Sequence, residues 1–204
     1  MRRPPAVLIA VCWALGNIAP AAGPPPSTPP ARPAQPGAES VATAPPTFAF
    51  KVEGLDGGSL SNTDFRGKIL VVDVWATWCG PCRMVIPHLS KLREKYRARG
   101  VEVVGLSVDE PVPDGGGYLQ VKSFVAEYAI KYPIGLMNKT VYRELVALMG
   151  ADPRAGFSIP TTVVMARDGR LLKIYPGYFR GQEREIERVI EQTLGAETPP
   201  KPKP

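Results

Sequence analysis

The chain has 204 residues, of which 44% are hydrophobic, and it carries three cysteines and a formal net charge of +6 at pH 7. This length suits one domain of ordinary size with extensions at its ends. No basic run is interleaved with aromatic residues, so the sequence argues against binding to nucleic acid.

The N-terminus has the pattern of a secretory signal peptide. Arg2 and Arg3 precede an uncharged, mostly apolar stretch at 6–16, and small residues at 19–21 follow at the spacing of a cleavage site. The apolar stretch is shorter than the roughly 20 residues of a membrane-spanning helix. We expect a signal peptide over residues 1–21 and export to the periplasm or cell envelope. An uncleaved N-terminal membrane anchor is the alternative.

Proline marks the limits of the folded domain. Ten of the 24 prolines lie between residues 20 and 46, which predicts an extended, semi-rigid linker over 22–46. The Pro- and Lys-rich end at 197–204 is not expected to fold. The remaining segment, 47–196, is long enough to bury a sizeable core.

Strand and helix patterns alternate along this domain. TFAFKV at 47–52 alternates apolar and polar residues, which is typical of a half-buried strand, and 55–68 is rich in turn residues. KILVVDVW at 68–75 is nearly continuously apolar, as in a central strand buried on both faces. Helical spacing then runs over 80–99, and Gly100 is suited to end that helix.

The rest of the domain continues the alternation. We predict a strand, a loop, a helix, a strand, a helix, a hairpin and a last helix, at 101–108, 111–117, 118–130, 132–137, 138–150, 159–179 and 182–194. Asn138 is suited to cap its helix and Gly150 to stop it, while Asp168-Gly169 marks the hairpin turn. This order predicts an α/β fold with a mixed central sheet and helices on both of its faces.

The sequence Cys79-Gly80-Pro81-Cys82 lies where a buried strand ends and a helix begins. Amide groups at a helix N-terminus favour an anion and lower the pKa of the first thiol of such a pair. Cys79 is therefore the expected nucleophile. Cys82, one turn into the helix, is placed to attack a mixed disulfide at Cys79.

A structural disulfide and a metal site are two other interpretations of this pair. A purely structural disulfide would close a very short loop and stabilise the chain weakly. A metal site needs further ligands, but the single histidine, His88, points away from Cys82 on the same predicted helix, and no second CxxC occurs. Cys12 falls in the apolar leader, so an exported protein would keep Cys79 and Cys82. We expect no metal and no cofactor.

Three segments in this order resemble the thioredoxin superfamily, and within it the exported TlpA/ResA-like thiol–disulfide oxidoreductases. They are DFRGKILVVDVWATWCGPCRMVIPHL, SIPTT and DGRLLKIYPGYF. The resemblance covers about residues 47–196. It implies a thioredoxin fold with an N-terminal β extension and a central helix insert.

The resemblance also implies roles for single residues. Trp78 would flank the active site, and Pro87 would kink the active-site helix. Pro160 would be the cis proline beside the cysteines, with Ile159 and Thr161 flanking the groove in which a client backbone docks. A cis bond is uncommon before proline, at about 5–6% of such bonds, so this expectation is specific.

Two positions depart from the TlpA/ResA-like pattern. Val85 stands three residues after Cys82, where these proteins usually carry Glu. Asp73 stands where they commonly have Asn, and cytoplasmic thioredoxins have a buried Asp there. Burial in an apolar strand should raise the pKa of Asp73. Asp73 could then accept a proton from Cys82 as Cys82 attacks.

We expect an exported, monomeric reductase of client protein disulfides. In this family the electron donor is typically a membrane protein of the DsbD/CcdA type, and cytochrome c maturation is a plausible setting. One alternative is a peroxiredoxin-like antioxidant, although Thr77 stands two residues before Cys79, where a peroxidatic cysteine expects Thr three residues before. The other alternative is a non-catalytic module that binds clients.

Overall fold

The computed structural model describes residues 45–109, 116–152 and 154–196. The predicted signal peptide or anchor, nearly all of the predicted linker and the C-terminal tail lie outside these residues. Within them, no helix has the length and apolar character needed to cross a membrane.

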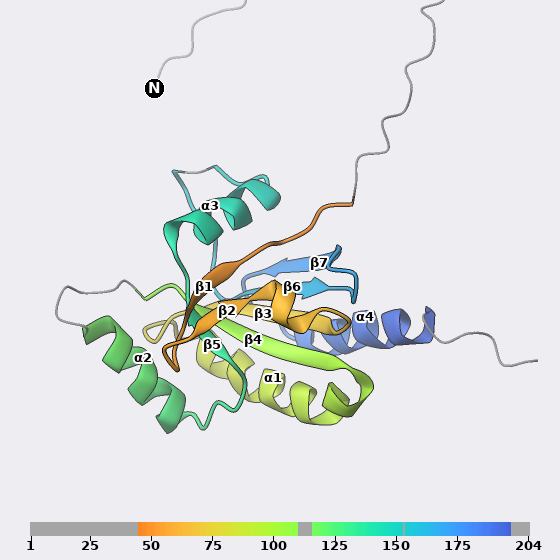
Figure 1. Cartoon of the computed structure of the whole chain (residues 1–204), viewed down its shortest axis with the longest axis horizontal. Coiled ribbons are helices and arrows are strands. Elements are labelled where there is room, and N and C mark those ends of the chain that lie inside the picture. The colour runs from red at the N-terminus through yellow and green to blue at the C-terminus, as the bar shows by residue number, and fades with distance from the viewer. Residues whose placement is uncertain (1–44, 110–115, 153, 197–204) are drawn as a thin grey trace, which may run out of the picture. The chain divides into compact units, whose positions relative to one another are not determined.

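A seven-stranded mixed sheet lies at the centre of the domain (Figure 1). Its strands are β1 Lys51–Gly54, β2 Ser59–Ser61, β3 Ile69–Trp75, β4 Val101–Ser107, β5 Ile134–Leu136, β6 Thr161–Met165 and β7 Leu171–Pro176. In space they run in the order β2-β1-β5-β4-β3-β6-β7. The β3–β4 and β4–β5 pairs are parallel and the others antiparallel. Both β3 and β4 are buried along their whole length, as their apolar sequences predict.

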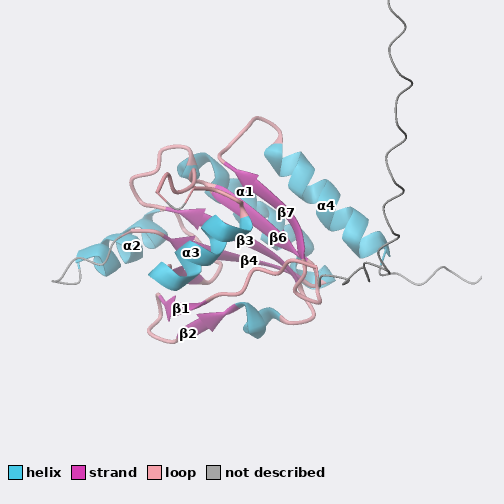
Figure 2. Ribbon diagram, turned by 90° about the horizontal axis from the view of Figure 1, so that it is seen from above, coloured by secondary structure: helices cyan, strands magenta, loops and turns pink. Residues whose placement is uncertain are grey.

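Helices cover both faces of the sheet, as predicted (Figures 1 and 2). They are α1 Cys82–Tyr96, α2 Gly116–Glu127, α3 Lys139–Leu148 and α4 Gln182–Ala196. The helices α1 and α4 pack on one face and α3 packs on the other. The hairpin of β1 and β2 forms the expected N-terminal β extension, and α2 with β5 forms the central insert before α3.

Two apolar cores result, and β3 contributes to both. Its odd-numbered residues Ile69, Val71 and Trp75 face the core beneath α1 and α4. Leu70, Val72 and Val74 face the core beneath α3. Because side chains alternate along a strand, Asp73 lies on the same face as Val71 and Trp75, beneath the helix that carries Cys82.

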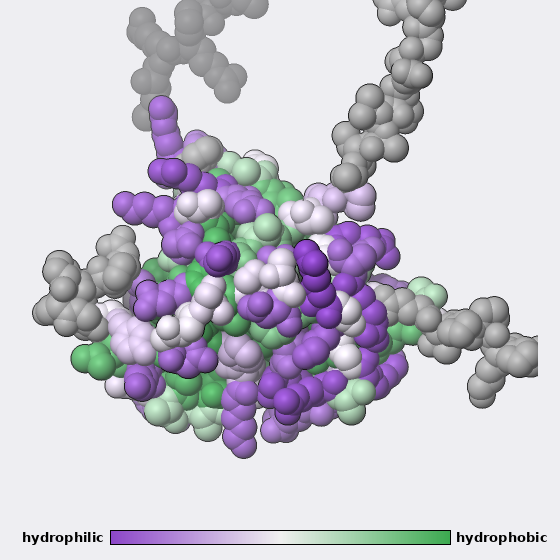
Figure 3. All heavy atoms as spheres, viewed as in Figure 1, coloured by the Kyte–Doolittle hydropathy of each residue, from purple (hydrophilic) through white to green (hydrophobic). Residues whose placement is uncertain are grey.

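Polar and charged side chains predominate in the face shown in Figure 3. The large hydrophobic side chains that stay exposed among the described residues are Trp78, Met84, Leu119 and Phe179. Trp78 is the most exposed of them, at 67%. It directly precedes Cys79, so an unpartnered apolar surface lies next to the cysteine pair.

The strand predicted at 47–52 is wrong for its first four residues. Only Lys51 onward pairs in β1, and Thr47 makes a single isolated bridge to Arg170. Phe48 and Phe50 are 0% and 3% exposed because they insert into the core beneath α3. The alternation of apolar and polar residues here therefore reflects burial of every second side chain, and no strand pairing accompanies it.

The segment 55–68, predicted as turns, also contains a strand and a short helix. β2 pairs with β1, and a 3₁₀ helix follows at Asn62–Phe65. The Asp64 carboxylate accepts the Ser61 N–H at 2.8 Å, and the Ser61 hydroxyl accepts the Thr63 N–H at 3.2 Å. Ser61 and Asp64 thus form a capping box at the start of this helix. The Ser-x-x-Asp spacing was the available signal for this helix.

The other boundaries agree with the prediction to within a few residues. Asn138 caps α3 by accepting the N–H of Val141 at 3.0 Å, and Gly100 adopts a left-handed conformation after the active-site helix. The helix predicted at 118–130 begins earlier, at Gly116. Tyr118 in its first turn donates a 2.5 Å hydrogen bond to the carbonyl of Leu55, which helps to hold this glycine-rich start in place.

Candidate active site

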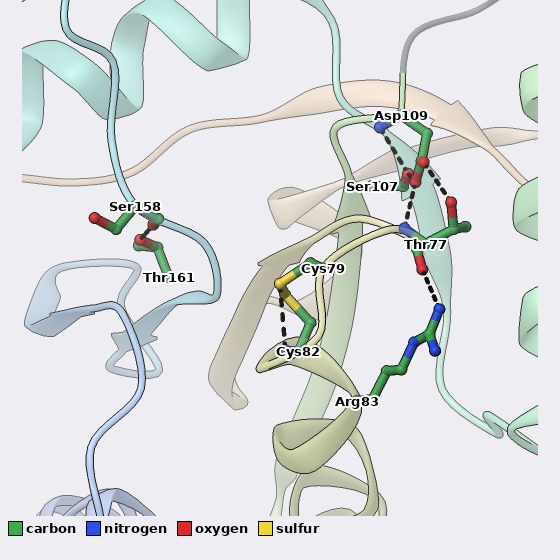
Figure 4. The surroundings of a disulfide bond; sticks show 8 residues. All are labelled: Thr77, Cys79, Cys82, Arg83, Ser107, Asp109, Ser158 and Thr161. Atoms are coloured by element: carbon green, nitrogen blue, oxygen red, sulfur yellow. Dashed lines mark hydrogen bonds between the residues drawn. A yellow bond between two sulfur atoms is a disulfide. The ribbon is translucent and has the colours of Figure 1, made fainter.

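The cysteine pair joins the C-terminal end of β3 to the start of α1. Cys79 and Cys82 form a disulfide with an S–S distance of 2.00 Å (Figure 4). Cys82 is fully buried, whereas Cys79 retains 4% exposure. The backbone N–H of Cys82 donates to the Cys79 sulfur at 3.2 Å. When the disulfide is reduced, this N–H and the helix N-terminus favour the thiolate at Cys79.

The residues predicted to contact a client are Trp78, just before Cys79 in the sequence, and 159–161, far after it. The Ile159–Pro160 bond is cis, as predicted. Thr161 begins β6 and pairs with Val74 near the end of β3, which places 159–161 beside the strand that leads to Cys79. The Thr161 hydroxyl donates to the carbonyl of Ser158 at 2.5 Å and fixes this turn (Figure 4).

Asp73 is fully buried in the core beneath α1. Neither of its carboxylate oxygens has a hydrogen-bond partner among the residues that the structure describes. Burial raises the pKa of this carboxyl from 3.8 to about 7. Thr162 lies opposite Asp73 across β3 and β6, and its hydroxyl favours the carboxylate, which limits the rise in pKa. The two side chains do not reach hydrogen-bond geometry.

The space around Asp73 is shaped by a glycine on the neighbouring strand. Gly105 pairs with Asp73 across β3 and β4. A Cβ at Gly105 would lie 2.8 Å from Trp75 Nε1 and 3.3 Å from the ring of Tyr132. The Trp75 N–H and the Tyr132 hydroxyl are, like the carboxylate, buried without a partner among the described residues. Polar groups therefore converge where Gly105 lacks a side chain.

No second ionisable group is placed beside Asp73 by Val85 or Lys68, the two positions that the sequence singled out. Val85 is 4% exposed and packs as an apolar residue in the core beneath α1. Lys68 lies before the start of β3, and its Nζ is 3.9 Å from Glu102 Oε2. In the described part of the chain, no three His, Cys, Asp or Glu side chains gather closely enough to hold a metal ion.

The sequence interpretation missed a polar network around Thr77, two residues before Cys79 (Figure 4). Asp109, just beyond β4, accepts the Thr77 N–H at 3.0 Å and the Thr77 hydroxyl at 2.7 Å. The Ser107 hydroxyl donates to the same carboxylate at 2.7 Å. Gln120 from α2 donates to the Thr77 hydroxyl at 2.9 Å, and Arg83 donates to the Thr77 carbonyl at 3.1 Å.

A signal for this network was present in the sequence. Ser107 and Asp109 sit at the end of a buried strand that lies parallel to β3. Because the carboxyl ends of parallel strands meet at one edge of a sheet, polar residues there point to the site that β3 also reaches. The contributions of Gln120 and Arg83 depend on how α2 packs, which local patterns do not reveal.

Residues 40–190 match the Redoxin family. The chain belongs to this family. The Redoxin-family chain is 30% identical over 150 residues to "Thiol-disulfide oxidoreductase ResA" of Bacillus thuringiensis subsp. konkukian, covering 74% of this chain and 75% of that protein. It is also 30% identical to a ResA of Halalkalibacterium halodurans over 142 residues, with 70% and 72% of the two chains covered.

Solved structures give the same assignment. A crystal structure of a "thiol:disulfide interchange protein, thioredoxin family protein" from Chlorobium tepidum is similar to this Redoxin-family chain with a TM-score of 0.61 at 27% identity, covering 74% of this chain and 98% of that one. The predicted thioredoxin fold and TlpA/ResA-like membership are confirmed. With the paired Cys79 and Cys82, these relatives support protein-disulfide oxidoreductase activity.

Proposed function

We propose that this protein is an exported reductase of client protein disulfides. The observation that carries the proposal is the Cys79–Cys82 disulfide at the start of α1, with Cys79 the more exposed and its sulfur accepting the Cys82 N–H. In the dithiol form, the Cys79 thiolate attacks a client disulfide, and one client sulfur leaves as a thiolate. Cys82 then attacks the Cys79 sulfur, which breaks the mixed disulfide and releases the second client sulfur as a thiolate. The client gains two electrons and two protons, and the protein disulfide forms.

Asp73 is the proposed proton acceptor for Cys82 in the second step. Its carboxyl lies on the face of β3 beneath α1, the helix that begins with Cys82. Its pKa of about 7 is close to neutral pH. Such a value suits a group that must take up and release a proton in each cycle.

Trp78 with Ile159, Pro160 and Thr161 is the proposed surface for the client chain. Trp78 offers an exposed apolar ring next to Cys79. Ile159 and Pro160 directly precede β6, and Thr161 pairs with Val74 near the end of β3. Both loops adjoin the end of β3, which supports the proposal that an extended client segment docks between them.

The reducing direction rests on the Gly-Pro dipeptide shared with thioredoxin. Thioredoxin has a potential near −270 mV and DsbA one near −120 mV, so a CxxC motif alone does not fix the direction. A reductase outside the cytoplasm needs electrons, and we assign them to a membrane donor of the DsbD/CcdA type. Cytochrome c maturation in the periplasm or envelope is the proposed setting, for a monomer held by an N-terminal anchor or released. A measured potential above about −150 mV would overturn the reducing direction.

The geometry does not favour the two alternatives. A peroxidatic cysteine uses a neighbouring Thr hydroxyl, but the Thr77 hydroxyl is bonded to Asp109 and Gln120. A module that only binds clients needs no cysteine pair, whereas Cys79 and Cys82 are paired at a helix N-terminus.

Insulin reduction tests the proposed function. Cys79→Ser should abolish turnover, because the serine hydroxyl cannot form the mixed disulfide. Cys82→Ser should stop after one step and hold the client in a mixed disulfide with Cys79, which also identifies clients in the native envelope. Full activity of Cys79→Ser would refute the proposal.

A further inference from the structure

The loop that carries Cys79 is bonded to three neighbouring elements through one residue, Thr77. All of its polar groups are bonded: the N–H and the hydroxyl to Asp109, the hydroxyl also to Gln120, and the carbonyl to Arg83. Thr77 is 4% exposed and Asp109 is 8% exposed. We call these four residues the Thr77 clamp.

The clamp connects the active-site loop to the central insert. Gln120 belongs to α2, and Arg83 lies over two aromatic rings from the same region. The guanidinium carbon of Arg83 is 5.8 Å from the ring centre of Phe124 and 5.9 Å from that of Tyr128. Those two rings are stacked at 4.2 Å. Arg83, the residue directly after Cys82, therefore contacts both the active-site loop and the central insert.

We propose that Thr77, Asp109 and Gln120 are positioning residues for Cys79 and that the clamp adjusts the redox equilibrium of the cysteine pair. In the disulfide form, the bond between Cys79 and Cys82 ties the loop to α1 covalently. In the dithiol form that tie is absent, and the clamp is what keeps the Cys79 sulfur over the N–H of Cys82. Loss of the clamp therefore costs the dithiol form more free energy than the disulfide form.

Thr77→Val is the test variant, because it removes the hydroxyl, changes no charge and keeps a branched side chain of similar volume. It leaves Asp109 without one donor and Gln120 without its acceptor. In equilibrium with glutathione, where two glutathione thiols are oxidised for each protein disulfide reduced, we expect a shift of about tenfold toward the protein disulfide. This corresponds to a potential about 30 mV more negative.

Thr193→Val is the matched control. The Thr193 hydroxyl is also largely buried and donates to the carbonyl of Val189 at 2.8 Å, but it lies on α4. Its loss should lower the stability of both redox forms equally and leave the glutathione equilibrium unchanged. For Thr77→Val, urea unfolding should show a larger loss in the dithiol form, and the difference should equal the shift in the equilibrium.

Gln120→Ala keeps the test valid if Thr77→Val does not fold, because Gln120 is exposed and the change removes only the link from α2. We expect a shift of about threefold in the same direction. The proposal is overturned if neither variant shifts the glutathione equilibrium more than Thr193→Val does. It is also overturned if either variant shifts the equilibrium toward the dithiol. The inference rests on the proposed function, but the two fail differently: a wild-type protein that does not exchange with glutathione refutes the function, whereas normal exchange with unchanged equilibria refutes the clamp.

Discussion

Replacement of Asp73 by Asn should raise the stability of this protein at alkaline pH. The carboxyl of Asp73 is fully buried, and its pKa rises from 3.8 to about 7 on folding. Between these values the unfolded chain has released the proton and the folded chain still holds it. The unfolded state therefore binds fewer protons, and the free energy of unfolding falls as pH rises through this window.

The size of the effect follows from the shift. A change of one pH unit in pKa corresponds to about 1.4 kcal/mol, so ionised Asp73 costs the folded state about 4 kcal/mol above pH 7. Between pH 5 and pH 8 its contribution should lower the free energy of unfolding by roughly 2.5 kcal/mol. Asp73→Asn cannot ionise and should lack this decline. Its own buried amide will offset part of the gain at pH 8.

The assay is urea unfolding of the oxidised protein at pH 5 and pH 8. The informative quantity is the change in the free energy of unfolding between pH 5 and pH 8 in the variant, minus the same change in wild type. This difference cancels the contributions of the other titrating groups. Asp152→Asn, the same substitution at an exposed position, should behave as wild type does. If wild type and Asp73→Asn lose stability in parallel from pH 5 to pH 8, the assigned burial effect is wrong.

Two further substitutions test the surroundings of the cysteine pair. Val85→Glu places a carboxyl at a 4% exposed position and should lower the free energy of unfolding by about 2–4 kcal/mol at pH 8 and by less at pH 5; Val85→Met, measured alongside by urea unfolding, should cost much less, and equal losses would contradict the apolar packing. Gly105→Ala places a Cβ 2.5 Å from Ile134 Cδ1 and 2.8 Å from Trp75 Nε1, and should cost about 1–3 kcal/mol in thermal unfolding. Gly195→Ala, which meets nothing within 4 Å, is its control, and a tolerated Gly105→Ala would show that this space is not needed.

The sequence was sufficient for the parts of the site that local pattern determines. The apolar run of β3 predicted both the burial of Asp73 and the rise of its pKa, because an acid in a two-sided buried strand has no route to water. The position of the cysteines at a strand-to-helix junction predicted Cys79 as the nucleophile, and Cys79 is the more exposed of the two. The same local rules misplaced 47–50, since alternating burial occurs there without strand pairing.

The Thr77 clamp shows what local pattern does not determine. Thr77 and Asp109 are 32 residues apart in the chain, and their contact depends on the parallel register of β3 and β4. Gln120 depends in addition on the direction in which α2 leaves the sheet. The sequence marks these residues as polar, but only the packed insert shows that their hydrogen bonds meet at one residue of the active-site loop.

The position of Asp73 argues that its charge has a use beyond structure. A cost of about 4 kcal/mol at neutral pH is a large part of the 5–15 kcal/mol by which domains are stable. Asn or an apolar residue at this position would avoid that cost, since the carboxylate makes no compensating hydrogen bond within the described chain. Buried groups that destabilise the fold cluster at functional sites, and Asp73 lies on the face of β3 that α1 covers. If proton transfer is its role, Asp73→Asn should slow the release of clients from Cys79 while it stabilises the protein, and a purely structural acid would show the second effect without the first.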